Sequence, residues 1–244
     1  MNSKYQEKGK REQAREVSEQ LGQQLSRFLE QLLVELDRHL DKRLVRTLAT
    51  LVLVIVQFRH NRHGLLLSEL GGYLLSPEQA PAGTKRISNL LRSRNWHAGL
   101  IASYLWRQGD ELVAELEGKG EPALCLWDES VLEKPESIAL EGLCPVRSST
   151  ARRLKRIKPG FYNPPSGRPV FVPGMQWVSL VVTGLKTVPR VAAMRWWSSR
   201  GPWSSQKRTE EHQLLTVAAR RWGQAVLHVF DRGFAGTPWL TLYP

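Results

Sequence analysis

Apolar side chains recur every three or four positions along the first quarter of the chain. Between residues 11 and 58, Gly22 is the one glycine and proline is absent. The positions with this spacing are Val17, Leu21, Leu25, Phe28, Leu32, Leu36, Leu40 and Leu44. Because such spacing gathers apolar groups on one face of a helix, it predicts at least one long amphipathic helix over residues 11–58. The apolar run 48–58 is about half as long as a membrane span, which indicates a buried helix.

Shorter helical patterns follow before residue 120. The stretch SPEQAPAG separates two of them, since proline and glycine commonly mark a break between helices. The last pattern ends at the turn Gly118, Lys119 and Gly120. The predicted helical segments are residues 65–75, 84–96 and 98–117. Residues 1–118 are therefore expected to form a helical N-terminal region.

Beyond residue 120, short runs rich in apolar, β-branched and aromatic residues replace the helical spacing. Strands are predicted at residues 123–127, 176–183, 191–197 and 225–230, with an amphipathic helix at 207–222. Three strands, a helix and a further strand predict a mixed sheet flanked by helices. The expected class is α/β, with a second domain over residues 119–244.

The charge of the chain is concentrated in one segment. The protein holds 35 Lys and Arg against 23 Asp and Glu, a net charge of +12. Residues 142–209 contain thirteen basic and no acidic residues, so the remaining 22 basic and 23 acidic residues nearly cancel. This distribution predicts a polyanionic partner such as nucleic acid. The alternative is a generally basic, solvated surface, although such surfaces normally intersperse both signs.

The most basic part of this segment is the predicted loop 145–173. It also contains Phe161 and Tyr162, and aromatic rings beside cations suit unpaired or distorted nucleic acid. A loop of this length is typical of a functional or disordered segment. Its candidate DNA-binding residues are Arg152, Arg153, Lys155, Arg156, Lys158 and Arg168.

The predicted helix 84–96 carries a second group of cations beside Ile87, Leu90 and Leu91. One interpretation is a helix laid against a phosphate backbone, and the other is an ordinary surface helix. The sequence favours neither. The candidate DNA-binding residues of this segment are Lys85, Arg86, Arg92 and Arg94.

Two aspartates follow apolar runs directly, Asp128 in LCLWDES and Asp231 in LHVFDRG. The carboxyl ends of strands in an α/β sheet are common places for functional sites. If the two strands are neighbours, the carboxylates converge, and a hard cation such as Mg²⁺ relieves their repulsion. Either Asp alone is more typical of a turn or a helix cap. The pair, set around a strongly basic segment, predicts a Mg²⁺ or Mn²⁺ site suited to phosphodiester chemistry.

Three stretches resemble a known family. These are LWDESVLEKPES, RLKRIKPGFYNPPSGRPVFVPGMQWVSLVVTG and especially VLHVFDRGFAGTPWL. They resemble the catalytic core of bacterial insertion-sequence transposases of the IS4-like DDE class, over roughly residues 119–244. The helical first half resembles the N-terminal DNA-binding region of these enzymes. The resemblance implies a ribonuclease-H-like fold in which Asp128 and Asp231 are the first two acidic residues of the catalytic triad.

The third acidic residue of the family, a Glu on a helix downstream of the second Asp, has no counterpart in the thirteen residues after Asp231. Glu210 and Glu211 precede that Asp and are not expected to replace it. The expectation is therefore a C-terminally incomplete transposase, inactive or incomplete as an enzyme. By resemblance its partners are double-stranded DNA of the transposon ends and target, and long amphipathic helices are compatible with a homo-oligomer.

Two other functions compete with this reading. A non-catalytic DNA-binding remnant needs the basic segments alone and would occupy transposon ends or associate with a full-length transposase. An RNA-binding protein is less well supported, because the sequence carries no motif of the common RNA-binding modules.

The remaining motifs narrow the compartment and the chemistry. The two cysteines, Cys125 and Cys144, are too few for a cysteine-rich zinc site and do not require a disulfide. The basic N-terminus has no apolar run behind it, so a signal peptide is not expected. A cytoplasmic, nucleoid-associated protein without a membrane partner follows. No nucleotide-binding glycine loop or serine-hydrolase motif is present.

Overall fold

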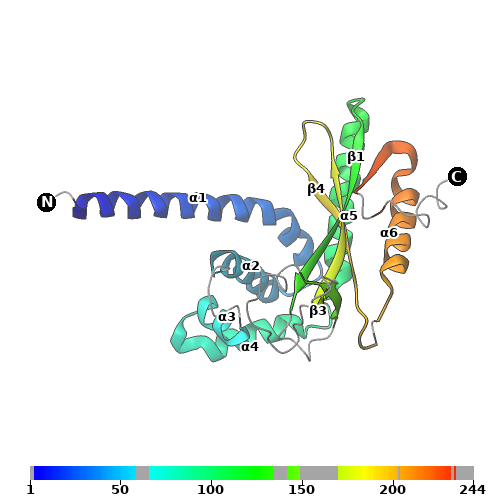
Figure 1. Ribbon diagram of the computed structural model, residues 1–244. Helices are drawn as coiled ribbons and strands as arrows, with labels where there is room; N and C mark the ends of the chain where they lie inside the picture. Colours follow the sequence, from blue (N-terminus) through cyan, green and yellow to red (C-terminus); the bar gives the residue numbers. More distant parts are fainter. Residues whose placement is uncertain are drawn as a thin grey trace. The chain divides into compact units, whose positions relative to one another are not determined.

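The computed structural model divides into two compact units, Met1–Tyr104 and Leu105–Pro244 (Figure 1). The sequence predicts a domain boundary after residue 118, which is the last residue of the helix Ala98–Gly118. The two units instead divide within this helix, after Tyr104. At residues 3–15 and 18 the backbone alone is described. The described residues are 3–58, 66–134, 142–148, 170–202, 204–231 and 234.

The first unit is helical. The predicted helix over residues 11–58 is divided in two, because the Asp41 carboxylate caps the second helix by accepting the Arg43 backbone N–H at 2.8 Å. The helices are α1 (Ser3–Asp37), α2 (Lys42–Phe58), α3 (Leu67–Leu74), α4 (Ala80–Leu91) and α5 (Ala98–Gly118), with a 3₁₀ turn η1 (Pro77–Gln79). On α1, Val17, Leu21 and Phe28 are exposed.

The start of α4 differs from the sequence prediction. The helix begins at Ala80, four residues before the predicted start, and it ends at Leu91 rather than at residue 96. Pro77 and Pro81 occupy the first turns of η1 and α4, where the missing N–H costs no helical hydrogen bond. The prolines of SPEQAPAG therefore begin helical turns rather than only separating helices.

Close backbone contact holds α3 against α4. A Cβ on Gly83 would lie 2.0 Å from the Gly71 carbonyl oxygen, so both helices need glycine at their crossing. Around the crossing, Leu51, Ile87 and Leu90 form a buried cluster. This packing fixes the side of α4 that remains open to solvent.

The second unit is a mixed open sheet with α5 and a further helix, which confirms the expected α/β class for the described residues. The strand order is β2-β3-β1-β5, and β4 pairs with β3 on the same edge as β2, farther along the strand. β1 runs parallel to β5, and all other pairs are antiparallel. The elements are β1 (Ala123–Glu133), β2 (Cys144–Arg147), β3 (Phe171–Thr183), β4 (Arg190–Trp197), α6 (Lys207–Trp222), the 3₁₀ turn η3 (Gly223–Ala225) and β5 (Val226–Phe230).

Pairing extends the strands beyond their predicted ends. β1 continues past Trp127 to Glu133 because it forms a ladder with β3 down to Gly174. Asp128 therefore lies inside a strand, opposite Ser179, and not directly after one. The short strand β2 lies in the segment that was predicted to be a loop, and it pairs with the start of β3.

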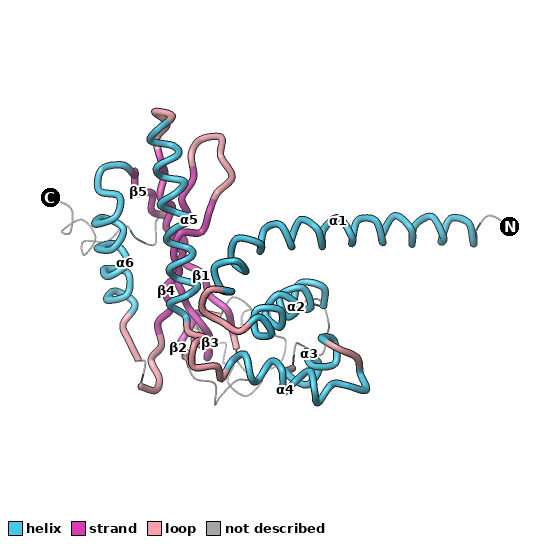
Figure 2. The backbone as a smooth tube through the Cα atoms, turned by 180° about the vertical axis from the view of Figure 1, so that it is seen from behind, coloured by secondary structure: helices cyan, strands magenta, loops and turns pink. Residues whose placement is uncertain are grey.

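The core of this unit lies between one face of the sheet and the helices α5 and α6. α5 runs along the strands (Figure 2), and a Cβ on its Gly109 would lie 2.6 Å from the Ala192 Cβ of β4. Asp110 of α5 accepts hydrogen bonds from Trp222 Nε1 at 2.8 Å and Arg221 Nη1 at 2.6 Å on α6. None of the described helices is long and apolar enough to span a membrane.

Candidate functional site

Asp128 and Asp231 are brought together by the parallel pairing of β1 and β5. The ladder ends with Trp127 opposite Phe230, and each aspartate is the next residue of its chain. Both aspartates are exposed. Ser130 Oγ donates a hydrogen bond to Asp128 Oδ2 at 3.0 Å. The pairing therefore sets the two aspartates side by side just past the end of the β1–β5 ladder, with Asp231 directly after β5 and Asp128 within β1.

An aromatic cluster supports this pair from the core face. Trp127 stacks on Phe230 at 5.3 Å between ring centroids, and its Nε1 donates to His228 Nδ1 at 3.0 Å. Burial lowers the pKa of His228, which favours the neutral ring that can accept this hydrogen bond. The Phe234 backbone N–H donates to the Asp231 carbonyl at 3.2 Å. The backbone on both sides of the two aspartates is therefore anchored in the core.

The donor set of the pair fits Mg²⁺. This ion is commonly bound by one or two protein carboxylates, with waters and substrate phosphates completing its octahedron. Exposed carboxylates on neighbouring strands leave room for those waters. Among the described residues, no group of three or more His, Cys, Asp and Glu side chains could hold a metal. A site here therefore relies on Asp128 and Asp231 as its protein carboxylates.

A second carboxylate pair lies on the opposite face of the same strand. Glu129 alternates with Asp128 and lies on the side of β1 that α6 covers, where Lys207 Nζ donates to its Oε2. Glu211 of α6 is fully buried, and Arg208 Nη1 donates to its Oε2 at 3.0 Å. Lys207 Nζ also lies 3.7 Å from Glu211 Oε1. Glu211 thus belongs to the core face and not to the face that carries Asp128.

Burial and the neighbouring Glu129 carboxyl raise the pKa of Glu211 to about 7. Oε1 of Glu129 and Oε1 of Glu211 are both buried without a hydrogen-bond partner among the described residues. A single proton held between the two carboxyls satisfies both oxygens, which explains why the neutral form is favoured. Sequence reasoning missed this cluster, although the spacing of Lys207 and Glu211 in KRTEEH is that of a helical ion pair.

The predicted DNA-binding residues fall into two groups. Lys85 and Arg86 are exposed on α4, Arg92 caps its C-terminus, and Arg94 is exposed just beyond it. The other group lies outside the described residues: Arg152, Arg153, Lys155, Arg156, Lys158 and Arg168. The structure therefore places Lys85 and Arg86 on the exposed side of α4, with Arg92 and Arg94 at and just beyond its C-terminal end.

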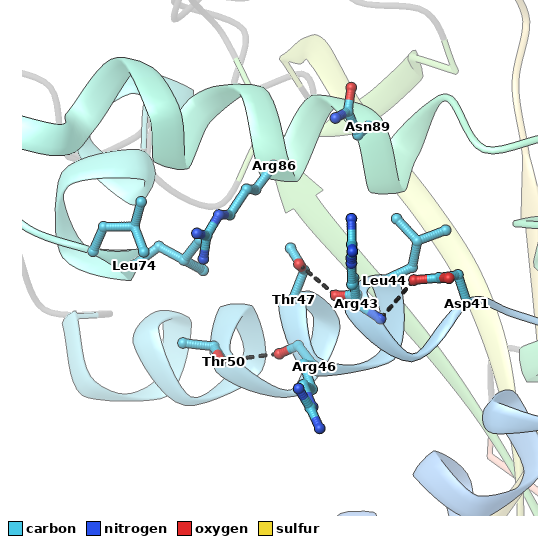
Figure 3. Close-up of a pocket in the computed structure, with 10 residues that line it drawn as sticks. Asp41, Arg43, Leu44, Arg46, Thr47, Thr50, Leu74, Arg86 and Asn89 are labelled. Atoms are coloured by element: carbon cyan, nitrogen blue, oxygen red, sulfur yellow. Dashed lines mark hydrogen bonds between the residues drawn. The ribbon is translucent and has the colours of Figure 1, made fainter.

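Arg86 also lines a groove of about 760 Å³ in the helical unit (Figure 3). The groove lies between α2 and α4, and Arg43 and Arg46 line it from α2. Sequence reasoning missed these two arginines. Their spacing in KRLVRT at the start of α2, three residues apart on one helix face, was the available signal.

A second groove, of about 610 Å³, runs along α6 and is lined by Arg195, Arg208 and Arg220. Two of these arginines are already paired, Arg195 with Glu210 at 3.9 Å and Arg208 with Glu211 at 3.0 Å. Its cations are therefore partly neutralised by the protein itself.

The two cysteine side chains of this unit are buried away from solvent. Cys125 and Cys144 are free and buried, and burial raises the pKa of the Cys125 thiol to about 12. A thiol with such a pKa stays protonated and is a poor nucleophile.

No protein-family model matches this chain, and no curated protein matches it. The fold and the site thus define an α/β protein with an exposed aspartate pair at the end of the parallel ladder of β1 and β5, together with a basic helical unit.

Proposed function

We propose that this chain carries the first two acidic residues of a DNA-binding transposase of the DDE class, without a counterpart of the third, and that Asp128 and Asp231 hold Mg²⁺ or Mn²⁺ against a phosphodiester. The observation that carries the proposal is the β1–β5 register, which ends at Trp127 and Phe230 and sets the two aspartates side by side. Both residues are the ones that the resemblance assigns to the catalytic triad. The sequence positions and the pairing are independent of each other, and they agree on the same two carboxylates.

The order of the elements supports the ribonuclease-H-like part of the proposal. β1, β3 and β4 form an antiparallel meander, α6 follows, and β5 then pairs in parallel with β1. Such a strand-strand-strand-helix-strand order is what that fold would show. A parallel partner for β1 requires a crossover connection, and α6 supplies it.

The residues of the site have separable roles in this proposal. Asp128 and Asp231 bind the cation, and Ser130 orients the Asp128 carboxylate through its hydrogen bond of 3.0 Å. When bound, the cation supplies a water of lowered pKa and neutralises charge on the phosphate. The exposed cations of α4 hold the DNA backbone by charge.

The family resemblance implies two transfers at the site. In the first, water attacks the phosphorus at the transposon end, the bond to the 3′ oxygen breaks, and a 3′-hydroxyl is released. In the second, that hydroxyl loses its proton and attacks a target phosphodiester, whose own 3′ oxygen leaves. The exposure of both aspartates is compatible with the approach of a duplex.

The test measures metal binding and DNA nicking separately. Mn²⁺ binding to the full chain is followed by electron paramagnetic resonance, and nicking by conversion of supercoiled plasmid to the open circle with Mg²⁺ or with EDTA. We expect Asp128→Asn and Asp231→Asn to weaken Mn²⁺ binding and to lower the weak nicking expected without the third acidic residue to the EDTA background. Glu121→Gln removes one exposed carboxylate just before β1 and serves as the matched control.

Each arm has an outcome that contradicts the proposal. Equal Mn²⁺ binding by Asp128→Asn and Glu121→Gln would contradict a metal site at Asp128. Mn²⁺ and DNA binding without Mg²⁺-dependent nicking in the wild type would contradict the catalytic half and leave the non-catalytic DNA-binding protein in its place. A chain that prefers duplex RNA to duplex DNA at matched salt would contradict the choice of partner.

A further inference from the structure

The groove between α2 and α4 is built from two helices that the core clusters hold together. Val45 and Val54 of α2 are buried, as are Ile87 and Leu90 of α4, so the opposite sides of both helices face out. The groove is lined by Asp41, Arg43, Leu44, Arg46, Thr47, Thr50, Leu74, Leu75, Arg86 and Asn89. In Figure 3, Arg43 projects from α2 toward α4, and Arg86 projects from α4 toward α2. The volume of about 760 Å³ is large for a single small ion.

The charge of the groove is unbalanced. Three arginines line the groove together with one acidic residue, Asp41, whose Oδ1 already accepts the Arg43 backbone N–H at 2.8 Å. In Figure 3 the Arg46 side chain projects from the side of α2 that faces away from α4. The guanidinium groups of Arg43, Arg46 and Arg86 have no ion pair with any described residue. In the groove along α6, by contrast, Arg208 is paired with Glu211 at 3.0 Å. The α2–α4 groove therefore has cationic charge left for an external anion.

The lining groups match a phosphodiester backbone. Arginine presents a planar fork of donors that binds phosphate oxygens in pairs. Thr47 adds an uncharged polar group beside Arg43, to whose backbone carbonyl it donates at 2.8 Å, whereas the Asn89 amide projects from α4 away from α2 in Figure 3. Asn89 and Arg86 lie on the exposed side of α4 that also carries Lys85, so the cations form a strip rather than a single pocket. A strip of this kind suits successive phosphates along a strand, whereas a free phosphate ion would need the cations to converge on one point.

We infer that the groove between α2 and α4 binds the phosphodiester backbone of duplex DNA, with Arg43, Arg46 and Arg86 as its cationic contacts. The inference rests on the proposed function for the identity of the polyanion. It adds α2 to the proposed DNA-binding surface of the helical unit. The sequence had suggested DNA-binding residues in this unit only in the segment 84–96. Backbone contacts of this type fix position and contribute affinity without reading sequence.

The test compares two double variants of the full chain that lose the same charge. Arg43→Gln with Arg46→Gln removes two cations from the groove. Arg27→Gln with Arg38→Gln, called here the α1 variant, removes one exposed arginine of α1 and one that directly follows it, and neither lines the groove. Binding to a fluorescent duplex is measured by anisotropy between 50 and 300 mM salt, and thermal unfolding followed by circular dichroism shows that each variant is folded.

We expect the groove variant to lower the slope of log affinity against log salt by about 2, since each phosphate contact contributes about 0.9. Its affinity should fall roughly tenfold or more at 100 mM salt, to a similar extent on unrelated duplex sequences. The α1 variant should keep the wild-type slope. Adding Arg86→Gln to the groove variant should lower the slope by about one further unit.

Several results would overturn the inference. If the groove variant and the α1 variant show the same slope of log affinity against log salt, the groove does not contact the DNA. Full competition by inorganic phosphate at constant ionic strength would indicate a site for the free anion, and a larger slope change on duplex RNA than on duplex DNA would indicate the other polymer. If the wild type does not bind DNA at all, the proposed function itself is contradicted. If the wild type binds DNA and the groove variant keeps the wild-type slope, only the assignment of the groove as a DNA contact is contradicted.

Discussion

Two neighbouring residues of β1 show how differently the same functional group can be used. Asp128 is exposed beside Asp231, and its carboxylate accepts a hydrogen bond from the Ser130 hydroxyl. Glu129 lies on the opposite face, where α6 covers it and Lys207 compensates its charge. Both pairs bring two carboxyl groups together from distant parts of the chain. The two pairs differ in their exposure to solvent and in the number of basic side chains that the protein places beside them.

The difference indicates which carboxylates are available for chemistry. The cost of placing Glu211 in the core is met by Lys207, Arg208 and a shared proton, so its charge is already balanced within the protein. Asp128 and Asp231 are exposed at the surface, where a cation from solution can approach them. An exposed carboxylate pair that dissolved ions can reach is the better candidate for a functional site than one buried in the core.

The largest expected effect is a pH dependence of stability that comes from the core pair. The folded-state pKa of Glu211, about 7, lies above the value of 4.5 in the unfolded chain. The folded state therefore binds more protons between these values, and the free energy of unfolding falls as pH rises from 4.5 to 7, by up to about 1.4 kcal/mol per pH unit. Urea unfolding at a series of pH values measures this slope.

Glu211→Gln should remove that slope while keeping the size of the side chain. The lowered pKa of His228 acts in the opposite direction, because the unfolded state then binds more protons below pH 6.5. The variant should consequently become more stable as pH rises toward 6.5. An unchanged slope in Glu211→Gln would contradict the assignment of this titration to the core pair.

The next effect concerns the cation between the two glutamates. Lys207→Met should lower the free energy of unfolding at pH 8 by about 2 kcal/mol, because two carboxylates then face each other with Arg208 as the remaining cation. This value is below that of a fully buried pair, since the Lys207 side chain is 31% exposed. Chemical denaturation at pH 8 and at pH 5 tests the prediction.

The loss should be smaller at pH 5, where the pair retains a proton. Lys186→Met at an exposed loop position is the matched control and should change the free energy of unfolding by less than about 0.5 kcal/mol. Equal losses for the two variants would show that Lys207 does not compensate the buried carboxyls.

A smaller effect is expected for the aromatic support of the aspartate pair. Trp127→Phe removes the hydrogen bond from Nε1 to His228 Nδ1 and leaves a ring to stack on Phe230. We expect a loss of about 1–3 kcal/mol in the free energy of unfolding and a rise in the pKa of His228, followed by proton NMR. An unchanged His228 titration would contradict the coupling of the two side chains.

The smallest stability effect should occur at the exposed pair itself. Asp128→Asn is expected to change the free energy of unfolding by less than about 0.5 kcal/mol without metal, because its carboxylate is in water and removing its charge relieves repulsion. Equilibrium denaturation in EDTA measures this value. A loss of more than about 2 kcal/mol in the free energy of unfolding would show that Asp128 supports the fold, as Glu129 does.

The types of element could be predicted where their signal is local. The spacing of Leu32, Leu36 and Leu40 indicates a helix, and the apolar run ALCLW indicates a strand, because each period is written into consecutive residues. The ends of elements were predicted less well. β1 extends to Glu133 because it pairs with β3, and β3 starts at Phe171 because its first residues pair with β2. No local pattern in these segments contains the partner strand.

The candidate site divides in the same way. Asp128 and Asp231 could be selected from the sequence, since both follow apolar runs and both match a family motif. Arg43 and Glu211 could not be selected with the same confidence in their roles, because their surroundings are formed by residues far along the chain. The groove needs α4 opposite α2, and the buried cluster needs β1 beneath α6.

The sequence by itself determined the helical first unit, the α/β character of the second and the excess of positive charge, because periodicity and composition are local or additive properties. The tertiary structure decided which carboxylates are paired with each other, which of them are buried, and which arginines keep their charge for a partner. These outcomes depend on strand register and helix packing, which place residues from distant segments within contact distance. A one-residue change of register would exchange the faces of Asp128 and Glu129, and with them the two kinds of carboxylate pair.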